Sequence, residues 1–570
     1  MITSIVIATF NKLEYTQQCI ESIRKYTESG SYELIVVDNH STDGTVDWLR
    51  LQEDIKTIFN DQNLGFPKAC NQGIEIAIGD NVLLLNNDTV VTENWLSNLV
   101  VSLHSSAEIG AVGAITNNCS NLQTIPVSYS TIEEMQVFAA RINQSVSTMW
   151  EERLRLIGYC MLIKKSIIDQ IGLLDERFTP GNYEDDDYSM RIRQAGFKLL
   201  LCKDTFIHHY GSVSFREVSH SYKELMQRNS NKYTEKWGFQ PDEANPIDLN
   251  YINAIDRPKN SYFRVLHMGC GLGGTLLKIK HTYPNAEVFG YEINESIVQA
   301  ATKSVKISLM DIEHIQDQLE KNYFDYIIVQ DPLVSNVVSL MEMLKEDGTL
   351  ITIYPHLLHH NVIRDMISGA INRQQLQALT IVEVEQIFRG ISFDNFEITG
   401  IVTDYLSNAD KQFLNSLTDI VQRDNSKINE VIGMMVKAKR IDKVTEMKYI
   451  INQVVSQADL VYYVPRLAAC DEQKIRQLVE NSGAGQVVEM FNYLAVQLLD
   501  QEYLNQALAY LKAAFELDQG NSTTVFNLGL TMYRMGHFVL ALDWFELLPE
   551  KNEQVLGWMS QIRHEIAVQV

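Results

Sequence analysis

The sequence predicts a multidomain α/β protein in which two α/β domains are followed by an all-helical segment. Short apolar segments alternate with helix-like stretches in the first 110 residues, and the alternation returns between about residues 262 and 405. This pattern is typical of parallel sheets covered by helices on both faces. From residue 410 onward strand-like segments disappear, so we expect helices only.

The composition is that of an ordinary globular protein. Apolar residues make up 45% of the 570 residues and charged residues 21%. At roughly 150 residues per domain, three or four domains are expected. The formal net charge of −24 argues against non-specific electrostatic binding of nucleic acid. Phosphate groups can still be held by metal ions and backbone amides.

The cysteines and the N-terminus bear on the compartment. The seven cysteines are spread singly without a C-x-x-C pair, so neither a zinc site nor a disulfide framework is predicted. No basic segment precedes the first apolar run, and no run of about 18 apolar residues occurs. We therefore expect a cytoplasmic protein without a transmembrane segment, which could lie peripherally at the inner face of the membrane.

In the first domain, expected over residues 1–240, three strands come early. They are SIVIAT, ELIVVDN and VLLLNND, with a helix through Ile20 and Ile23 after the first. Ligands bind at the carboxyl ends of strands in such sheets. Asp38 and Asp88 each follow an apolar strand and are candidates for this edge.

Three features of the first domain carry possible chemistry. Asp88 is placed to hold a metal ion, although Asn and Asp after a strand often make only a turn. Glu184, Asp185, Asp186 and Asp187 are consecutive, and crowded carboxylates repel one another, which raises a pKa as a general base requires. A solvated acidic helix N-terminus is the alternative. The pair His208–His209 follows another apolar run and could add a metal or phosphate ligand.

Residues 1–238 resemble glycosyltransferase family 2, in its rhamnosyltransferase-like branch. The resemblance rests, in order, on TSIVIATFNKLEYTQQCIESI, ELIVVDNHSTDGT, NLGFPKACNQGI, VLLLNNDTVV, YEDDDYSMRIRQAGF and HHYGSVS. It implies the GT-A fold, a nucleotide-sugar donor, a divalent cation (Mn²⁺ or Mg²⁺) and an inverting single displacement.

The resemblance also implies roles for individual residues. Asp38 would contact the nucleotide base, Thr9 would line the same pocket, Asn87 would lie near the ribose, Asp88 would bind the metal, Asp185 would be the catalytic base, and His208 would complete the metal or diphosphate site. Asn86 and Asn87 stand where some relatives have Asp, so this sequence departs from those relatives at the position that would lie near the ribose.

Residues 241–258 are rich in Pro and polar residues, so a linker is expected there. The second domain, expected over residues 259–405, begins with RVLHMGCGLGGTLLKI, a strand followed by a glycine-rich turn and a helix start. Gly269, Gly271 and Gly274 satisfy G-x-G-x-x-G, so a nicotinamide dinucleotide is one candidate ligand. Glu292, at the end of the next strand, could bind ribose hydroxyls in either case.

Later segments resemble class I S-adenosylmethionine-dependent methyltransferases with a Rossmann-like fold. They are SLMDIEHI, YFDYIIVQDPL and MLKEDGTLITIYPH. The resemblance implies that Gly269, Gly271 and Gly273 cradle the methionine part, Glu292 binds the ribose and Asp311 the adenine side. His267 replaces the usual acidic residue, Val334–Ser335 replaces an acidic–histidine pair, and no catalytic base emerges. A binding module without activity therefore stays open.

The helical segment, residues 410–570, contains an internal sequence repeat. Phe491 and Phe526 begin similar stretches, and Tyr503 and Phe538 fall at matching offsets. The period of about 34–35 residues is that of a tetratricopeptide helix pair. The segment has no cluster of chemistry-bearing residues, so we expect it to bind a protein partner. A packing support is the alternative.

Together these features predict an enzyme of bacterial cell-surface polysaccharide or glycoprotein assembly. It would transfer a sugar to a glycan, a lipid-linked glycan or a protein, and its second domain would O-methylate the glycan. The alternative is a glycosyltransferase whose methyltransferase-like domain is inactive and whose repeats form a scaffold for partners.

Overall fold

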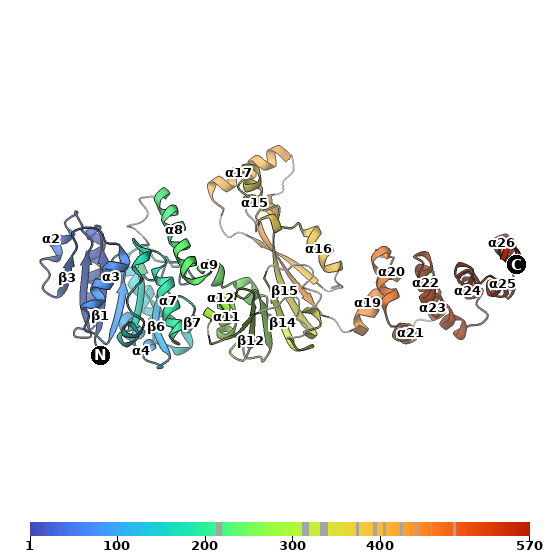
Figure 1. Ribbon diagram of the computed structural model, residues 1–570, viewed down its shortest axis with the longest axis horizontal. Helices are drawn as coiled ribbons and strands as arrows, with labels where there is room; N and C mark the ends of the chain where they lie inside the picture. The colour runs from blue at the N-terminus through green and yellow to red at the C-terminus, as the bar shows by residue number, and fades with distance from the viewer. Residues whose placement is uncertain are drawn as a thin grey trace. The chain divides into compact units, whose positions relative to one another are not determined.

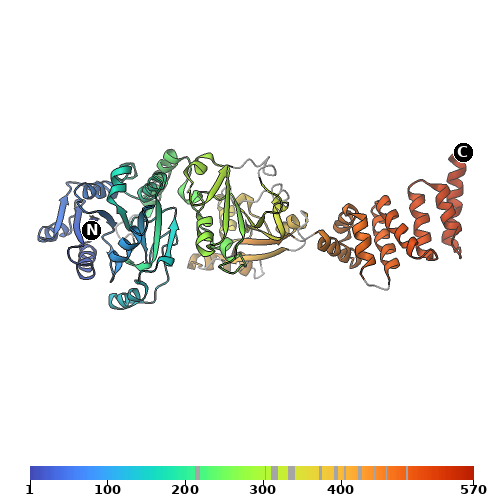
Figure 2. The ribbon, with the colours of Figure 1, turned by 90° about the horizontal axis from the view of Figure 1, so that it is seen from below.

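The computed structural model divides into two compact units, Met1–Lys439 and Arg440–Val570. Figure 1 and Figure 2 show the two large sheets of the first unit and the helices of the second. The structure describes residues 1–211, 219–301, 303–309, 319–330, 340–371, 375–390, 396–402, 406–421, 426–440, 443–457, 459–482 and 486–569. Within these ranges no helix has the length and apolar character needed to cross a membrane.

The first sheet has the strand order β3-β2-β1-β4-β8-β6-β9-β7. Its strands are β1 (Thr3–Thr9), β2 (Tyr32–Asp38), β3 (Ile55–Phe59), β4 (Asn81–Leu85), β6 (Ile109–Ile115), β7 (Trp150–Arg153), β8 (Cys160–Lys164) and β9 (Lys198–Phe206). The strands β1 to β4 are parallel, whereas β8 runs antiparallel to β4 and β6, and β7 antiparallel to β9. A separate two-stranded ladder pairs β5 (Thr89–Val90) with β10 (His208–His209).

Helices cover both faces of this sheet, as the sequence predicts. They are α1 (Leu13–Tyr26), α2 (Thr45–Leu49), α3 (Phe66–Glu75), α4 (Trp95–Leu103), α5 (Ile132–Ile142), α6 (Lys165–Ile171), α7 (Glu184–Gln194) and α8 (Ser219–Trp237). Side chains alternate along β1, so Ile5 and Ile7 pack toward α1 and α4, while Val6 packs toward α3, α5 and α6. The period-two pattern of the strand thus builds two separate cores.

The second sheet has the order β13-β12-β11-β14-β15-β17-β16, with its first strand in the middle. Its strands are β11 (Arg264–Met268), β12 (Glu287–Glu292), β13 (Lys306–Leu309), β14 (Phe324–Val329), β15 (Leu344–Pro355), β16 (Phe396–Val402) and β17 (Val431–Lys439). The first five are parallel, and β17 runs antiparallel between β15 and β16. The helices are α11 (Gly274–Thr282), α12 (Glu295–Ala300), α15 (His360–Ser368), α16 (Ile381–Gly390), α17 (Asn408–Val421) and α18 (Ser426–Asn429).

Strand β17 corrects the expectation that residues beyond 410 form helices only. Met434, Val436 and Ala438 are buried in alternation along it, which is the period of a strand. The strand follows two helices in sequence, α17 and α18, and precedes the helices of the second unit, so its period of two stands in a helical context. The second sheet therefore extends past the expected domain end at residue 405.

The expected linker over residues 241–258 is also corrected. It forms the short helices α9 (Pro241–Ala244) and α10 (Leu249–Asn253), and its Tyr251 and Ile252 are buried. Proline is suited to a first helical position, so Pro241 starts a helix here and does not mark a free linker. These residues join one apolar cluster with Met190 of the first domain and Leu276 of the second.

The second unit consists of helices throughout its described residues. They are α19 (Lys443–Val455), α20 (Leu460–Ala469), α21 (Glu472–Glu480), α22 (Val487–Asp500), α23 (Leu504–Leu517), α24 (Ser522–Arg534), α25 (Phe538–Glu546) and α26 (Glu553–Gln569). From α22 onward each helix packs against the next. Asn492 and Asn527, which follow the echoed phenylalanines, hydrogen-bond to each other at 3.1 Å. The helical class is confirmed, and the assignment to tetratricopeptide repeats stays a prediction.

Candidate active sites

The carboxyl ends of β1 and β2 place Thr9 directly opposite Asp38. Asp38 is 1% exposed, and its Oδ2 accepts a hydrogen bond from the Ser41 amide at 2.9 Å. Its Oδ1 is buried and has no hydrogen-bond partner within the described part of the chain. A buried acceptor without a partner costs free energy, so this oxygen is available to a donor group on a ligand.

Asn87 ties the end of β4 to the first strand and helix. Its Nδ2 donates to the hydroxyls of Thr9 at 3.2 Å and Thr16 at 3.0 Å, and these two hydroxyls lie 2.9 Å apart. The structure thus brings Thr9, Asp38 and Asn87 to one edge. The amide nitrogen of Asn87 is used by the fold, which leaves its carbonyl oxygen for a ligand.

Two histidines lie beside Asp88, because the β5–β10 ladder pairs His208 and His209 with the residues that follow it. Nε2 of His209 is 3.2 Å from Oδ1 of Asp88, and the His209 ring stacks on Tyr159. Nδ1 of His208 hydrogen-bonds with the Tyr129 hydroxyl at 2.6 Å. His209 is therefore a site residue that the resemblance did not single out, although its place in the HH pair was a signal for it.

His208 has one ring nitrogen that can bind a ligand. Its Nε2 is buried without a hydrogen-bond partner in the described residues. Burial, and to a smaller extent the neighbouring His209, lowers the pKa of His208 to about 4, so its imidazole is neutral at neutral pH. No three His, Cys, Asp or Glu side chains of the described ranges come together as a complete metal site. One carboxylate and a neutral imidazole fit a divalent cation whose other ligands are oxygens of a bound molecule.

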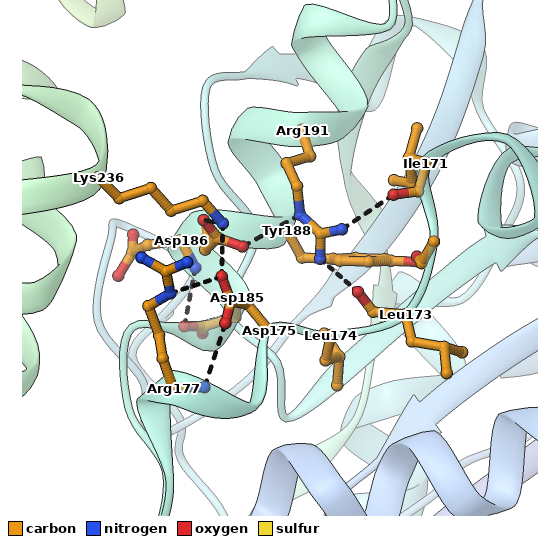
Figure 3. A network of polar contacts seen from close by, with 12 residues as sticks. Ile171, Leu173, Leu174, Asp175, Arg177, Asp185, Asp186, Tyr188, Arg191 and Lys236 are labelled. Carbon is orange, nitrogen blue, oxygen red and sulfur yellow. Dashed lines mark hydrogen bonds and ion pairs between the residues drawn. The ribbon is translucent and has the colours of Figure 1, made fainter.

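The four consecutive carboxylates at the start of α7 separate into two kinds. Asp186 is paired with Arg155 at 2.8 Å. Asp187 is fully buried and is held by Lys236 at 2.6 Å, Arg191 at 3.1 Å and the Trp237 indole N–H at 3.0 Å. Figure 3 shows Arg191 also reaching the carbonyl oxygens of Ile171 and Leu173. Asp186 and Asp187 are therefore structural.

Glu184 and Asp185 form no ion pair within the described residues. Oδ2 of Asp185 accepts the Gly158 amide at 2.9 Å. Burial, and next the charge of Asp186, raises the pKa of Asp185 to about 6. Burial, and next the charge of Asp185, raises the pKa of Glu184 well above its usual value. Asp185 is half-buried and so keeps access to solvent, and a carboxylate with a pKa near neutrality has the property that a general base needs.

A loop before α3 connects the strand edge to the carboxylates. Nδ2 of Asn39 donates to the Gly65 carbonyl at 3.2 Å, and the Phe66 amide donates to the Pro180 carbonyl at 2.8 Å. Gly65 has φ +85°, and a Cβ there would lie 2.9 Å from Cα of Pro180. This close approach holds the segment before α7 against the strand edge. Sequence reasoning missed Asn39 and Gly65, because their role depends on residue 180.

In the second domain, the glycine-rich loop and the end of β12 come together as the sequence predicts. Gly269, Gly271 and Gly273 all have positive φ. The Glu292 carboxylate is buried and accepts the amides of Gly271 at 2.9 Å, Ile293 at 2.8 Å and Asn294 at 3.1 Å. A carboxylate offers about four lone-pair positions, so one remains for a hydroxyl donor such as ribose. Asp311 lies outside the described residues.

The protein's own packing also requires two of these glycines. A Cβ at Gly271 would lie 2.4 Å from the Ala244 carbonyl oxygen, which accepts the Leu272 amide at 2.7 Å. A Cβ at Gly273 would lie 2.8 Å from Val305.

Behind the loop, His267 is buried with both ring nitrogens unpartnered in the described residues, and burial lowers its pKa to about 3. His267 is thus a neutral core residue.

Comparisons with known proteins agree with this geometry. Residues 4–172 match the family model described as glycosyl transferase family 2, and residues 259–386 match the one described as methyltransferase domain. The chain therefore carries a family 2 glycosyltransferase domain with a GT-A-like sheet and a Rossmann-like methyltransferase domain. The rhamnosyltransferase branch stays a prediction.

Individual relatives are distant. Glycosyltransferase AglE of Haloferax volcanii is 23% identical over 206 residues, 35% of this chain and 64% of the relative. A low-salt glycan biosynthesis hexosyltransferase of the same organism is 26% identical over 39% of this chain and 71% of its own. An uncharacterized protein of Sinorhizobium fredii is 24% identical over 43% of this chain and 28% of its own. The chain thus spans less than two thirds of the length of the Sinorhizobium fredii protein (28%) and of AglE (64%).

Among solved structures, the mannosyltransferase PcManGT from Pyrobaculum calidifontis in complex with GDP-Man and Mn²⁺ is 15% identical. The match covers 50% of this chain and 72% of that one, with a TM-score of 0.32.

Proposed function

We propose that the first domain transfers a sugar from a nucleotide-sugar to an acceptor hydroxyl with inversion at the anomeric carbon. The observation that carries the proposal is Asp185, a carboxylate without an ion-pair partner among the described residues, with its pKa raised to about 6. The contact between Phe66 and Pro180 holds the segment before α7 against the loop that Asn39 contacts after β2. The match of residues 4–172 to the glycosyltransferase family supports the same reaction.

Different residues at the strand edge would bind different parts of the nucleotide-sugar donor. The unpartnered Oδ1 of Asp38 accepts from the nucleotide base, and Thr9 lines that pocket. The carbonyl oxygen of Asn87 accepts from a ribose hydroxyl. Asp88 with His208, and His209 beside them, would hold a divalent cation, Mn²⁺ or Mg²⁺, which when bound neutralises charge on the departing diphosphate.

Asp185 performs the proton transfer. Its carboxylate takes the proton of the acceptor hydroxyl, and that oxygen attacks the anomeric carbon on the side opposite the diphosphate. The Gly158 amide at 2.9 Å fixes the orientation of the carboxylate. The name of one relative, a glycan biosynthesis hexosyltransferase, favours a hexose donor and a glycan acceptor. A lipid-linked glycan and a protein are the other acceptors proposed.

The helical unit is proposed to recruit a protein partner or the acceptor. Incubation of the full chain and of residues 1–439 with a panel of nucleotide-sugars and Mn²⁺ tests both roles. We expect both proteins to release nucleoside diphosphate from the same donor. Only the full chain should transfer the sugar at full efficiency to acceptors in an extract of the source organism.

Either part of this experiment can fail separately. If neither protein binds or cleaves any nucleotide-sugar, the proposed transferase activity is wrong. Equal transfer by both proteins to the same acceptor would contradict the recruitment role and leave the helices as a packing support.

For the second domain, we propose that the glycine-rich loop and Glu292 bind S-adenosylmethionine, which when bound supplies an electrophilic methyl group. The remaining lone pair of the Glu292 carboxylate fits a ribose hydroxyl. O-Methylation of the same glycan is the proposed reaction. The alternative is a binding domain without activity, in a protein whose helices form a scaffold.

Glu292→Ala should weaken binding of S-adenosylhomocysteine by about 10- to 100-fold, because a hydrogen bond to a charged group contributes ~1.5–3 kcal/mol. Calorimetry on the full chain measures this. Glu295→Ala, an exposed carboxylate three positions on, is the control and should bind normally. Tight binding of NAD with no response to the methionine-derived ligand would identify the loop as a dinucleotide site.

A further inference from the structure

A buried charge cluster joins the two α/β domains. Glu151 on β7, the edge strand of the first sheet, is 1% exposed and forms an ion pair with Lys278 on α11 of the second domain. Arg153 lies 2.9 Å from the same carboxylate, and Lys203 and His281 face it at 3.9 and 3.8 Å. We call these five residues the interdomain charge cluster.

The cluster depends on its cations. Burial acts to raise the pKa of Glu151, but Arg153 and then Lys278 outweigh it and hold that pKa below its usual value. Glu151 is therefore ionised at neutral pH. Removing one partner from a buried ion pair leaves an uncompensated charge, which is strongly destabilising at that place.

Strand β7 continues directly into the segment that holds the start of α7. Arg155 pairs with Asp186 at 2.8 Å, and the Leu156 amide donates to Ser189 Oγ at 3.2 Å. The Gly158 amide donates to Oδ2 of Asp185 at 2.9 Å. Residues 151–158 thus connect α11 of the second domain to the proposed base of the first.

Packing couples the same two helices. Met190 of α7 and Leu276 of α11 belong to one apolar cluster, together with Leu154 and Tyr183. In addition, Arg193 near the end of α7 donates to the Ala300 carbonyl at 3.2 Å. The second domain therefore forms part of the support of α7.

We propose that Lys278 of the second domain is a positioning residue for sugar transfer, because it holds Asp185 in place through Glu151 and residues 154–158. The inference rests on the proposed role of Asp185 as base. It makes the methyltransferase domain a structural part of the glycosyl-transfer site, whatever chemistry that domain performs itself.

The expected effect follows from the groups that face Asp185. Glu184 and Asp186 on its own helix are acidic, while Arg155 and the Gly158 amide face it from the segment after β7. Asp242 faces Arg155, and Cys119 lies near Asp185. The Gly158 amide and Arg155 lower the pKa of Asp185 against the effects of burial and Asp186. Loosening residues 154–158 weakens these two contacts, so the pKa should rise.

Lys278→Met keeps the apolar stem and removes the charge. We expect a lower kcat and an upward shift of the midpoint of the pH–rate profile by about half a pH unit or more, since the base must be ionised. The KM for the donor should change little, because Thr9 and Asp38 lie on other strands and Asp88 lies between β4 and β5. Lys278→Arg should restore the wild-type profile.

Two controls separate this effect from others. Lys280→Met removes a charge from the same helix but outside the cluster. The Lys280 ammonium donates a hydrogen bond to the Ser304 carbonyl, and this variant should leave the pH–rate profile unchanged. His281→Gln should also leave the midpoint unchanged, which excludes titration of the cluster's own histidine. If Lys278→Met does not fold, Glu151→Gln should give a shift in the same direction.

A folded Lys278→Met or Glu151→Gln protein with the wild-type pH profile overturns the proposal, as does an equal shift in Lys280→Met. If the wild-type protein cleaves no nucleotide-sugar, the proposed function itself falls, and the proposal falls with it. An active wild type with unshifted variants contradicts only the positioning role.

Discussion

Asp185→Asn is expected to lower the rate of sugar transfer by about 10²–10⁴-fold while leaving donor binding nearly intact. Asparagine keeps the shape of the side chain but cannot accept a proton at neutral pH. In the wild-type protein the base must be ionised, so the rate should rise with pH through about 6, the pKa of Asp185. Steady-state transfer rates and nucleoside diphosphate binding, measured on the same preparations, separate the two effects.

The stability of this variant gives an independent check. The folded pKa of Asp185 is raised, so its contribution to stability is present below the unfolded pKa of about 3.9 and is lost as pH rises through about 6. At pH 7–8 the asparagine variant should therefore unfold at no lower temperature than the wild type. Low activity together with a lower melting temperature would point to misfolding and not to loss of a base.

Asp242→Asn is the matched control for Asp185→Asn. It makes the same change of charge beside the same Arg155, on a side chain that is 73% exposed. Its transfer rate should stay close to that of the wild type. If Asp185→Asn kept more than half of the wild-type rate, Asp185 would not be the base.

Asp88→Ala is expected to abolish metal-dependent binding of the donor, with a loss of affinity of about 100-fold or more. The diphosphate would lose the counter-charge that a divalent cation provides, and that contribution amounts to several kcal/mol. Calorimetry with nucleoside diphosphates, with Mn²⁺ and with excess chelator, measures it. The wild type should lose affinity in chelator, and the variant should bind weakly in both conditions.

Three further variants sharpen this result. Asp47→Ala removes an exposed carboxylate of α2 and should bind the donor normally. His208→Ala and His209→Ala decide which imidazole assists Asp88, since His209 contacts it at 3.2 Å while His208 has the unpartnered Nε2. Full activity of the wild type in excess chelator would contradict a metal site.

Much of the strand edge could be read from local sequence. Apolar strands followed by polar residues predicted that Asp38, Asp88 and Glu292 lie at the carboxyl ends of strands. Asp38 and Glu292 are the last residues of β2 and β12, and Asp88 lies in the segment between β4 and β5. The α/β class of both domains and the helical class of the tail are likewise confirmed. These features depend on residue periods of 2 and 3.6 within short segments, which neighbouring residues alone set.

Other features depend on residues far apart in the chain. Only the fold shows that Asp187 pairs with Lys236, that Asp186 pairs with Arg155, and that Asp185 forms no ion pair among the described residues. In sequence the four carboxylates look alike. Ion pairing is decided by which distant side chains the tertiary structure brings within a few ångströms, and local periodicity carries no information about that.

The same reason explains the corrections. Residues 241–258 look like a linker because Pro and Asn are frequent, yet Tyr251 is buried in a core built by both domains. Strand β17 looks like part of the helical tail until β15 and β16 supply its partners. The sequence by itself determined the type of each domain and the edge at which its polar residues gather. The tertiary structure decided which carboxylate stays unpaired, and that the two domains share one core, because both depend on contacts between residues that are distant in sequence.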